Sequence, residues 1–520
     1  MTNTDSYLKD IQQLIRAEDY PKLFEYMEEN VERFFSSANY SEAYQNIRSI
    51  NVATSKSPIP KLIKAWLAFL CGDNVVLSSV MKTINEAELK DAHEYSLFCS
   101  LKAISGWNSS MNEREQYACL SVDILPKEDK SFYMANAQLT YGQMLSSQEK
   151  LRKAAEAFAK AYDLFDYNDM QFPAVVSRVN ELLNRGKLGE FRSVIDICQN
   201  LLIMSAQFNT EKENVWNILH LPLGICYYEL NRPHLAVNHL LQAKENIERL
   251  KLFHMHGLIE IYLFKAYHSL HDRTSMAKTY SDSFAIYEPM HDRMGKIIMS
   301  SFYLLMDPEK NDSLTQYNIQ QLEMIYETYK ENTPSLAIQV LVYLKSKGLS
   351  HIITRKEVNN HLERLRYIGL IPDLHLFLVL NANLHQYEDN EASAISNLQE
   401  ALVVHKEFGI SAAFNYVSAP MLTHLKRLDA KLWQVFANGE DAENTVEEGQ
   451  LLSGREKEIM QLIAKGKTNK EVGDLLFIGV GTVKWHINHI FSKLQVSNRV
   501  QAIEKAKAMG EISNLISCKS

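Results

Sequence analysis

The sequence of 520 residues lacks the features of secreted, membrane-inserted and disulfide-linked chains. Its six cysteines stand singly at positions 71, 99, 119, 198, 226 and 518, without a CxxC pair or a regular spacing. This pattern argues against a disulfide framework and against a zinc cage. The amino-terminal segment is polar and charged, and no apolar run approaches the roughly 20 residues that cross a bilayer. We therefore expect a cytoplasmic protein that does not bind a membrane.

Motifs of catalysis and nucleotide binding are also missing. No GxxxxGK(S/T) loop occurs, and the one tempting segment, Gly466 to Thr468, has Gln461 where the first glycine belongs. No nucleophile motif or paired carboxylates are visible, so we expect no catalytic residue, no cofactor and no enzyme activity. His486 and His489 have a spacing that could chelate a metal, but no third ligand is evident, so we expect no metal site.

Strand-like alternation is rare in residues 1–436, and glycine occurs only 19 times in the whole chain. Apolar residues in this region recur with helical spacing, which predicts an all-α fold. A chain of this length exceeds the usual size of one core, so we expect at least two structural units.

A template of small residues recurs three times within residues 1–436. Gly142, Ala154, Phe158 and Ala161 follow one another at spacings of 12, 4 and 3. The same spacings relate two further sets, which are Gly224, Ala236, Leu240 and Ala243, and Ala382, Ala394, Leu398 and Ala401. Small residues at the first, second and fourth positions would let two antiparallel helices approach closely, and the larger third residue would fill the space between them.

This template resembles the tetratricopeptide helix pair, although the 82 residues between Gly142 and Gly224 suggest units longer than the usual 34 residues or so. Weaker candidate pairs lie at Arg178 to Cys198 and at Leu263 to Phe284. The resemblance implies a tetratricopeptide-like superhelix of about ten helical hairpins with a concave inner groove. Such a groove would take a small-molecule, peptide or protein effector, whose contact residues we do not name.

Charge is distributed unequally along the chain. Residues 450–520 hold 11 Lys and Arg against 6 Asp and Glu, although the whole chain has a net charge of −8. A basic carboxy-terminal segment on an acidic body is typical of a small DNA-binding module, because neutralised phosphates supply much of its affinity. Between the two, residues 437–449 are acidic and are interpreted as a solvated linker.

The last segment contains four short amphipathic helices with marked starts. Ser453 with Glu456 and Thr468 with Glu471 have the capping-box pattern, which predicts the starts of the first two helices. A third helix is expected from about Val480 to Leu494, with Gly479 at its cap. The fourth is expected to begin at Ser497 and to end at Gly510.

The third helix of this segment has one apolar and one polar side. Val483, Ile487, Ile490 and Leu494 form an apolar stripe that predicts packing on the other helices. The opposite side offers Lys484, Trp485, Asn488 and Ser492, which can bond base edges or phosphates. Burial of Trp485 against a neighbouring helix, or plain solvation of Lys484 and Asn488, is the alternative interpretation.

These residues resemble the carboxy-terminal DNA-binding domain of LuxR-type transcription regulators. The positions that agree with the family pattern are Leu452, Arg455, Glu456, Glu458, Leu462, Ile463, Ala464, Gly466, Asn469, Lys470, Glu471, Leu476, Ile478, Thr482, Val483, Lys484, His486, Ile490, Lys493, Leu494, Val496, Arg499 and Ala502. Gly473 and Gly479 depart from the alanine and serine that the family prefers.

The resemblance implies a four-helix helix-turn-helix domain over residues 450–520 that reads double-stranded promoter DNA. Lys484, Trp485 and Asn488 fall on its base-reading positions. Thr482, Lys493 and Arg499 match positions that hold the DNA backbone or the fold, and Asn469 and Lys470 complete the expected DNA-binding set. Family members commonly pair through the closing helix, here Ser497 to Met509, so a homodimer on DNA is expected.

Residues 450–520 are called the head, and residues 1–436 the body. Together, the repeat body and the head resemble MalT-like activators without their nucleotide-binding switch domain. We interpret the chain as a bacterial transcription regulator in which residues 1–436 sense an effector and control promoter binding, with RNA polymerase as a further candidate partner. The alternative is a helical-repeat interaction scaffold whose head is a degenerate DNA-binding domain. Gly473 and Gly479 favour that alternative, and Lys484, Lys493 and Arg499 argue against it.

Overall fold

The computed structural model describes residues 4–36, 38–89, 91–208, 215–250, 252, 255–287, 293–306, 313–330, 333–437, 454–476, 487, 490–491, 494, 496 and 498–509. Every regular element among these residues is a helix, which confirms the predicted all-α fold class. The chain divides into two compact units, Met1–Glu440 and Asp441–Ser520.

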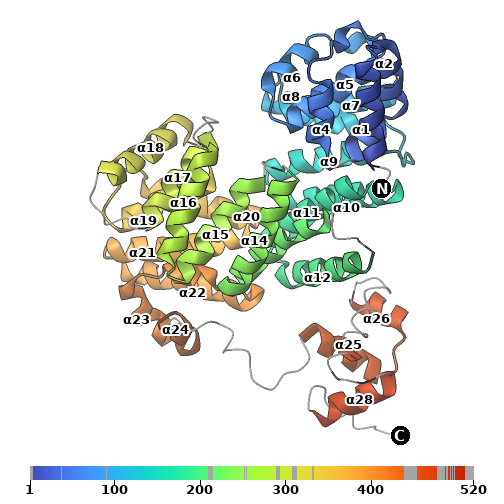
Figure 1. Cartoon of the computed structure of the whole chain (residues 1–520). Coiled ribbons are helices and arrows are strands. Elements are labelled where there is room, and N and C mark those ends of the chain that lie inside the picture. Colours follow the sequence, from blue (N-terminus) through green and yellow to red (C-terminus); the bar gives the residue numbers. More distant parts are fainter. Residues whose placement is uncertain are drawn as a thin grey trace. The chain divides into compact units, whose positions relative to one another are not determined.

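The first unit begins with a bundle of short helices, coloured blue in Figure 1. Most residues of the apolar helix α5 (Ile59–Leu70) are buried, including Leu62, Ile63 and Trp66. Helix α5 packs against α2, α4, α6 and α7, so it lies at the centre of the bundle. The other helices are α1 (Thr4–Arg16), α2 (Tyr20–Glu29), α3 (Val31–Ser36), α4 (Tyr40–Ile47), α6 (Asn74–Met81), α7 (Ala92–Ser105) and α8 (Met111–Asp123).

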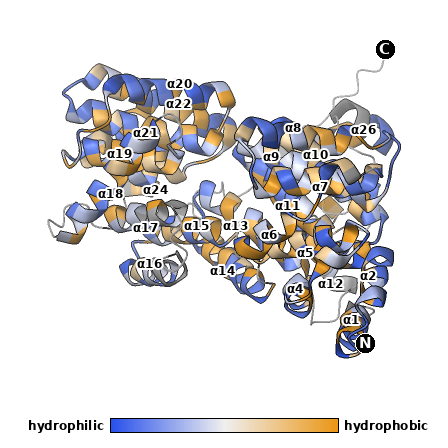
Figure 2. Ribbon diagram, turned by 90° about the horizontal axis from the view of Figure 1, so that it is seen from above, coloured by the Kyte–Doolittle hydropathy of each residue, from blue (hydrophilic) through white to orange (hydrophobic). Residues whose placement is uncertain are grey.

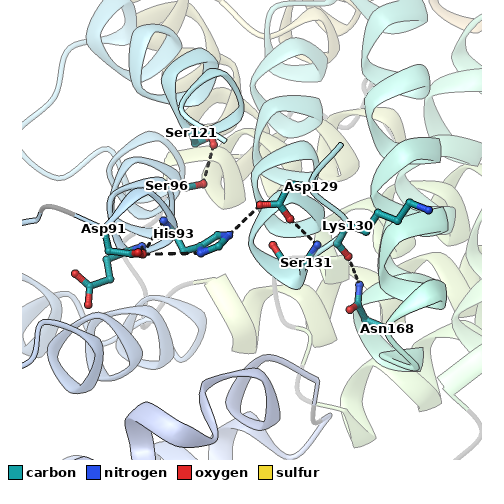
Figure 3. A network of polar contacts seen from close by, with 9 residues as sticks. Asp91, His93, Ser96, Ser121, Asp129, Lys130, Ser131 and Asn168 are labelled. Atoms are coloured by element: carbon teal, nitrogen blue, oxygen red, sulfur yellow. Dashed lines mark hydrogen bonds and ion pairs between the residues drawn. The ribbon is translucent and has the colours of Figure 1, made fainter. Parts of the chain in front are cut away.

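A polar network joins this bundle to the next helices (Figure 3). Asp91 caps α7 by accepting the backbone N–H of His93 at 2.9 Å, and the His93 ring Nε2 lies 2.9 Å from Asp129 Oδ2. Asp129 also accepts the backbone N–H of Ser131, directly before α9 (Phe132–Ser147). Burial raises the pKa of Asp129, but the bonds from Ser131 and His93 outweigh it and leave the pKa below its ordinary value. The network therefore ties the starts of α7 and α9 together.

The three copies of the small-residue template lie on three antiparallel helix pairs. These pairs are α9 with α10 (Leu151–Tyr167), α13 (His220–Glu229) with α14 (Pro233–Arg249), and α21 (Ile371–Tyr387) with α22 (Glu391–Phe408). Every template residue with a side chain is at most 1% exposed. A Cβ atom on Gly142 would lie 2.8 Å from the Phe158 ring, and one on Gly224 would lie 2.7 Å from Leu240 Cγ. The predicted close approach is therefore present in both pairs.

The turn inside each pair has the same backbone geometry. Glu149, Asn231 and Asp389 have φ angles of 60°, 55° and 56°, in the left-handed region. The amide that follows each of them donates to the carbonyl five positions earlier at 2.9 Å, which is the bond of a Schellman helix end. Gly189 and Gly348 hold the equivalent position in other turns. The repeated turn explains how the paired helices keep the same spacing.

Helices between and beyond the template pairs follow in sequence. The weaker candidate regions contain α11 (Gln171–Lys187) with α12 (Phe191–Phe208), and α15 (His256–Ser269) with α16 (Arg273–Tyr287). The later elements are α17 (Arg293–Met306), α18 (Ser313–Tyr329), α19 (Ser335–Ser346), α20 (Arg355–Ile368), η6 (Ala412–Tyr416), α23 (Ala419–Leu428) and α24 (Ala430–Ala437).

The later helices fold back onto the earlier pairs, and η6 contacts α13. Arg364 on α20 forms an ion pair with Glu149 at 2.6 Å, although the two residues are 215 positions apart. Asn415 donates to Asn231 Oδ1 at 3.1 Å and to Ser269 Oγ at 3.0 Å. A simple solenoid has contacts only between neighbouring repeats. This chain adds a long-range closure that the repeat pattern does not predict.

A buried polar cluster lies where the two groups of helices meet. The Ser411 N–H donates to the Glu229 backbone carbonyl at 2.9 Å, and the Glu229 side chain lines a small cavity together with Lys265 and Asp373. Asp373 accepts a 2.8 Å bond from Gln339. Burial raises the pKa of Glu229 to about 7, although Lys265 acts in the opposite direction. This carboxyl group is therefore largely protonated in mildly acidic solution.

Figure 2 shows that hydrophobic residues gather on the facing sides of the paired helices and hydrophilic residues on their outer sides. One apolar core runs through the first unit from Tyr7 to Leu432. None of the described helices is both long and apolar enough to cross a bilayer.

Candidate nucleic-acid interface

The second unit contains a separate small core. Its described helices are α25 (Gly454–Ala464), α26 (Asn469–Leu476) and α28 (Arg499–Ala508). Nine of the described residues are buried in this core, namely Ile459, Met460, Ile463, Val472, Ile487, Ile490, Leu494, Ala502 and Ala506. Short helices like these depend on tertiary packing for their stability. The core therefore sets the geometry of the head.

The predicted apolar stripe of the third helix contributes to this core. Ile490 and Leu494 are fully buried, and Ile487 is 8% exposed. Val483, the fourth member of the stripe, lies outside the described residues.

The turn between α25 and α26 is defined by its backbone. Gly466 has a φ angle of 80°, and the Lys467 N–H donates to the Leu462 carbonyl at 3.1 Å, which closes the end of α25. The next residue, Thr468, caps α26. Its hydroxyl accepts the Glu471 N–H at 3.3 Å, and the Glu471 carboxylate accepts the Thr468 N–H at 2.8 Å. The second predicted capping box is thus confirmed.

Glu471 is held in its charged form at this turn. The backbone bond from Thr468 and the side-chain bond from Lys467 lower its pKa to about 2. Lys467 Nζ lies 3.0 Å from Glu471 Oε1 on the helix surface. The lysine at this position thus has an intramolecular partner, which the sequence pattern does not reveal.

Arg499 connects three elements of the head. Its Nη2 donates to the backbone carbonyl of Ile463 at 3.4 Å and to that of Lys467, and its Nη1 donates to Asn469 Oδ1 at 3.4 Å. The side chain therefore joins the start of α28 to the end of α25 and the start of α26. Asn469 is partly buried beside it, whereas Lys470 is exposed. These contacts favour a fold-holding role for Arg499.

The start of the closing helix differs from the prediction by one residue. Ser497 was the expected cap and itself lies outside the described residues, but the cap is Asn498, whose Oδ1 accepts the Gln501 N–H at 3.0 Å. Asparagine and serine cap helices about equally well, so the adjacent pair could not be resolved from sequence. The helix also ends at Ala508, before the predicted end.

Most of the predicted DNA-contacting residues lie outside the described residues, namely Thr482, Lys484, Trp485, Asn488 and Lys493. The same holds for both histidines of the candidate metal pair, the Ser453 cap, Gly479, and residues 438–453, which contain most of the predicted linker. Of the predicted set, the structure places Asn469, Lys470 and Arg499. All three lie at the start of α26 or of α28.

Elsewhere in the described part of the chain, no group of three or more His, Cys, Asp and Glu side chains could hold a metal ion. His220 and His239 are hydrogen-bonded to each other, with their Nδ1 atoms 2.9 Å apart. Burial, together with the charge of His239, lowers the pKa of His220 to about 4. The pair is thus neutral near pH 7, and the structure provides no third ligand for it among the described residues.

In this unit, a first helix ends in a tight glycine turn, a capped second helix follows, and the next apolar segment packs into the same core. This arrangement defines the helix-turn-helix class of DNA-binding domain. The comparison with known families agrees with this class. Residues 450–506 match the family described as "Bacterial regulatory proteins, luxR family". This segment of the chain is homologous to the luxR-family regulators.

Individual regulators are similar over the same part of the chain. The transcriptional regulatory protein LiaR of Bacillus subtilis (strain 168) is 63% identical over 51 residues, which are 10% of this chain and 24% of that protein. The oxygen regulatory protein NreC of Staphylococcus carnosus (strain TM300) is 40% identical over 82 residues, or 15% and 38% of the two chains. The transcriptional regulatory protein DesR of Bacillus subtilis (strain 168) is 43% identical over 68 residues, or 13% and 34%. The chain therefore spans between a quarter and two fifths of these relatives' lengths.

Proposed function

We propose that this protein is a sequence-specific DNA-binding transcription regulator whose helical body controls its promoter binding. The observation that carries the proposal is the luxR-family match of residues 450–506 on a head with its own buried core. The body would be a tetratricopeptide-like sensor, supported by its three helix pairs with the same buried template and the same turn. As a regulator of bacterial promoters, the protein would act in the cytoplasm.

Within the head, we assign the base contacts to Lys484, Trp485 and Asn488 of the third helix. This assignment rests on the burial of Ile487 and Ile490, because residues next to a buried stripe on a helix lie on its other faces. Backbone phosphates would be held by the remaining predicted set, which is Thr482, Asn469, Lys470 and Lys493. Arg499 would act indirectly, by fixing the turn before α26.

Pairing of two heads is the second part of the proposal. Helix α28 buries Ala502 and Ala506 against its own domain and exposes Gln501, Glu504 and Ala508. The exposed residues recur at spacings of three and four, so they form one outward face along the helix. A two-fold pair through this face would read inverted half-sites of double-stranded promoter DNA. RNA polymerase would then be a partner at the promoter.

Control by the body requires a difference in free energy. An effector shifts the protein toward DNA binding only if it binds the DNA-competent arrangement more tightly than the other arrangement. We therefore expect an effector that binds the first unit to change the DNA affinity of the full chain, and DNA to change the effector affinity by the same factor.

The test is selection of binding sites from a random duplex library by the full-length protein. We expect an enriched motif with inverted symmetry that binds the wild type and is lost for the double variant Lys484→Ala and Asn488→Ala. Lys356→Ala removes one exposed positive charge from α20 of the body and serves as the charge control.

Thermal melting of each variant confirms that it folds. Recovery of the same motif with the double variant would refute the base-contact assignment. Absence of any enriched motif would favour the scaffold alternative, in which the head binds protein instead of DNA.

A further inference from the structure

Residues 410–418, which we call the strap, join the earlier and later helices of the first unit. The strap contains the short helix η6 and leads into α23. The Ser411 N–H donates to the Glu229 carbonyl of α13 at 2.9 Å, and Asn383 Nδ2 of α21 donates to the Tyr416 carbonyl at 2.7 Å. The strap is therefore bonded to both groups of helices, and its release would loosen the long-range closure between them.

Three imidazole rings from three different helices pack on the two aromatic side chains of the strap. His268 of α15 stacks on the Tyr416 ring, with centroids 4.9 Å apart and planes 6° from parallel. His375 of α21 and His405 of α22 meet the Phe414 ring edge to face, with centroids 4.9 and 5.9 Å from it. Both strap rings are buried. Because histidine is the side chain that ordinarily titrates between pH 5 and 8, this packing can respond to acid.

The nitrogen atoms of these rings differ in their hydrogen bonds. His405 Nδ1 lies 2.8 Å from the Ile410 carbonyl, so it carries a hydrogen and donates. Both nitrogens of His375 and Nδ1 of His268 are buried and have no hydrogen-bond partner among the described residues. An imidazolium has a hydrogen on each nitrogen and needs an acceptor for each. A proton taken up by His375 or His268 would therefore bury a charge without an acceptor at those atoms.

Other titratable and charged groups surround the strap. Two cavities border it, and the groups that line them are Tyr228 and Glu229 of α13, Tyr262 and Lys265 of α15, Tyr343 and Lys347 of α19, and Asp373 and Tyr387 of α21. His271, in the turn after α15, acts on His268 and disfavours its charged form. Of these groups, Glu229 is the one whose protonation at mildly acidic pH favours the closed arrangement.

The remaining elements beside α15 and α21 contribute charged groups that have partners of their own. Lys244 of α14 pairs with Glu260 of α15 and lies 3.6 Å from Asp282 of α16. Arg355 of α20 donates to Asn381 of α21, and His361 of α20 lies 3.3 Å from the Ser335 hydroxyl. His424 of α23 lies 3.4 Å from Glu391 of α22.

The direction of the pH effect follows from the pKa values of the two rings. Burial lowers the pKa of His268 to about 4 and the pKa of His375 to about 3, both from 6.5. The closed strap therefore has its full stability above about pH 6.5 and loses it as pH falls toward 4 and 3, because the open form binds protons more readily. Glu229, whose pKa is raised to about 7, acts in the opposite direction. The variant Glu229→Gln removes that opposing effect.

We propose that the strap is an acid-sensitive latch, in which protonation of His268 and His375 releases residues 410–418 and loosens the closure between the earlier and later helices. In the released form, Phe414 and Tyr416 would leave the two imidazole rings. The imidazolium ions would then be solvated by water, which the closed packing excludes.

The strap is connected to the segment that carries the DNA-binding head, and this step rests on the proposed function. Ser418 ends the strap and directly precedes α23, which packs on α24. Phe436 of α24 also contacts the Phe414 ring, with centroids 5.8 Å apart. These are the last described helices before residues 438–453. Release of the strap would therefore free α24 and change how the body holds the segment that leads to the head.

Hydrogen exchange of the full chain, measured by mass spectrometry between pH 5 and pH 8 and expressed as protection factors, tests the latch. In Glu229→Gln, protection of residues 410–418 should fall between pH 7 and pH 5 by about 20-fold for each of the two rings, or several hundredfold in all. The fall should be smaller in the wild type, where Glu229 opposes it. Adding His268→Phe and His375→Gln to Glu229→Gln should leave a fall of less than about threefold.

Each variant is compared with itself at two pH values, so a loss of stability that the substitution causes at every pH cancels. His268→Phe alone keeps a ring on Tyr416 and should remove about 20-fold of the fall, which keeps the test available if His375→Gln does not fold. His351→Gln removes an exposed histidine of the same unit and should leave the fall unchanged. Helices α9 and α10 contain no histidine and should stay protected throughout.

Two results would overturn the proposal. An equal loss of protection in α9 and α10 would show that the whole unit unfolds, and an undiminished fall in the variant without His268 and His375 would show that other groups titrate. Exchange is measured without DNA, so a failure here leaves the selected DNA motif intact. Conversely, absence of a DNA motif leaves the exchange result intact.

Discussion

Replacement of Gly224 by alanine tests whether the paired helices can approach closely only because the template positions hold small residues. Alanine normally stabilises a helix interior by up to about 1 kcal/mol relative to glycine. Here, however, the new Cβ would lie 2.7 Å from Leu240 Cγ and 3.2 Å from the Ala236 carbonyl oxygen. Overpacking of this kind costs about 1 to 3 kcal/mol. We therefore expect a net loss of about 1 to 2 kcal/mol in the free energy of unfolding.

Gly186 provides the matched control in α11. A Cβ at this position would meet only Cys226 Sγ, at 4.0 Å, which is an ordinary contact. Gly186→Ala should therefore gain the helix preference without the clash and be up to about 1 kcal/mol more stable than the wild type. Urea unfolding of the full chain, followed by far-ultraviolet circular dichroism, gives both values under one set of conditions.

A double variant identifies the cause of the loss. Leu240→Ala removes the two side-chain atoms nearest to the new Cβ and leaves only the Ala236 carbonyl oxygen at 3.2 Å, so it should be less damaging in the Gly224→Ala background than in the wild type. Strictly additive effects would show that the two residues do not interact as described. Equal stability of Gly224→Ala and Gly186→Ala would refute the close-approach argument itself.

Three further predictions concern charged groups. Arg499→Ala removes bonds to the carbonyls of Ile463 and Lys467, so the head should lose about 2 kcal/mol of local stability, seen by mass spectrometry as roughly 30-fold faster amide exchange in α25 and α26. The pKa of Glu229 is raised to about 7 by burial. The free energy of unfolding should therefore decrease as pH rises from about 4.5 to about 7, because the folded state must then hold a buried charge. Glu229→Gln should therefore flatten that part of the pH profile and be on the order of 2 to 3 kcal/mol more stable than the wild type at pH 8, as measured by urea unfolding; an unchanged profile would contradict the assignment. The pKa of Glu471 is lowered to about 2, so its capping contribution is complete above about pH 4.5 and is lost as pH falls toward 2. Amide exchange of α26 across that range should show the loss in the wild type and not in Glu471→Gln.

Much of the head could be predicted from sequence because its determinants are local. The Thr468 capping box and the Gly466 turn depend on residues within a few positions of one another, and both are present. The stripe of Ile487, Ile490 and Leu494 depends only on helical periodicity. Where two adjacent residues could both cap a helix, as at Asn498, the pattern alone placed the start one residue too early.

The helix pairs of the body could be predicted from sequence, but the long-range contacts between its later and earlier helices could not. The template located Gly142 and Gly224 because a missing side chain at a close crossing is visible in the sequence. The left-handed turns were not visible, because Glu149 and Asp389 occupy a backbone conformation that glycine usually takes. Contacts such as Arg364 with Glu149 join positions far apart in the chain, and no local pattern encodes them.

The candidate site shows the same division. Sequence left open whether Arg499 holds the DNA backbone or the fold of the head, and its bonds to the carbonyls of Ile463 and Lys467 favour the second role. Neither carbonyl could be identified as a partner from the sequence, because both belong to a different helix or turn.

Genome-wide mapping of DNA sites by crosslinking and immunoprecipitation tests the central claim most directly. The wild type should give sharp peaks that share one motif, and the double variant Lys484→Ala and Asn488→Ala should lose them at equal protein abundance. Lys356→Ala should retain the peaks. Wild-type peaks that persist in the double variant, or no peaks for the wild type across several growth conditions, would contradict regulation through sequence-specific DNA binding.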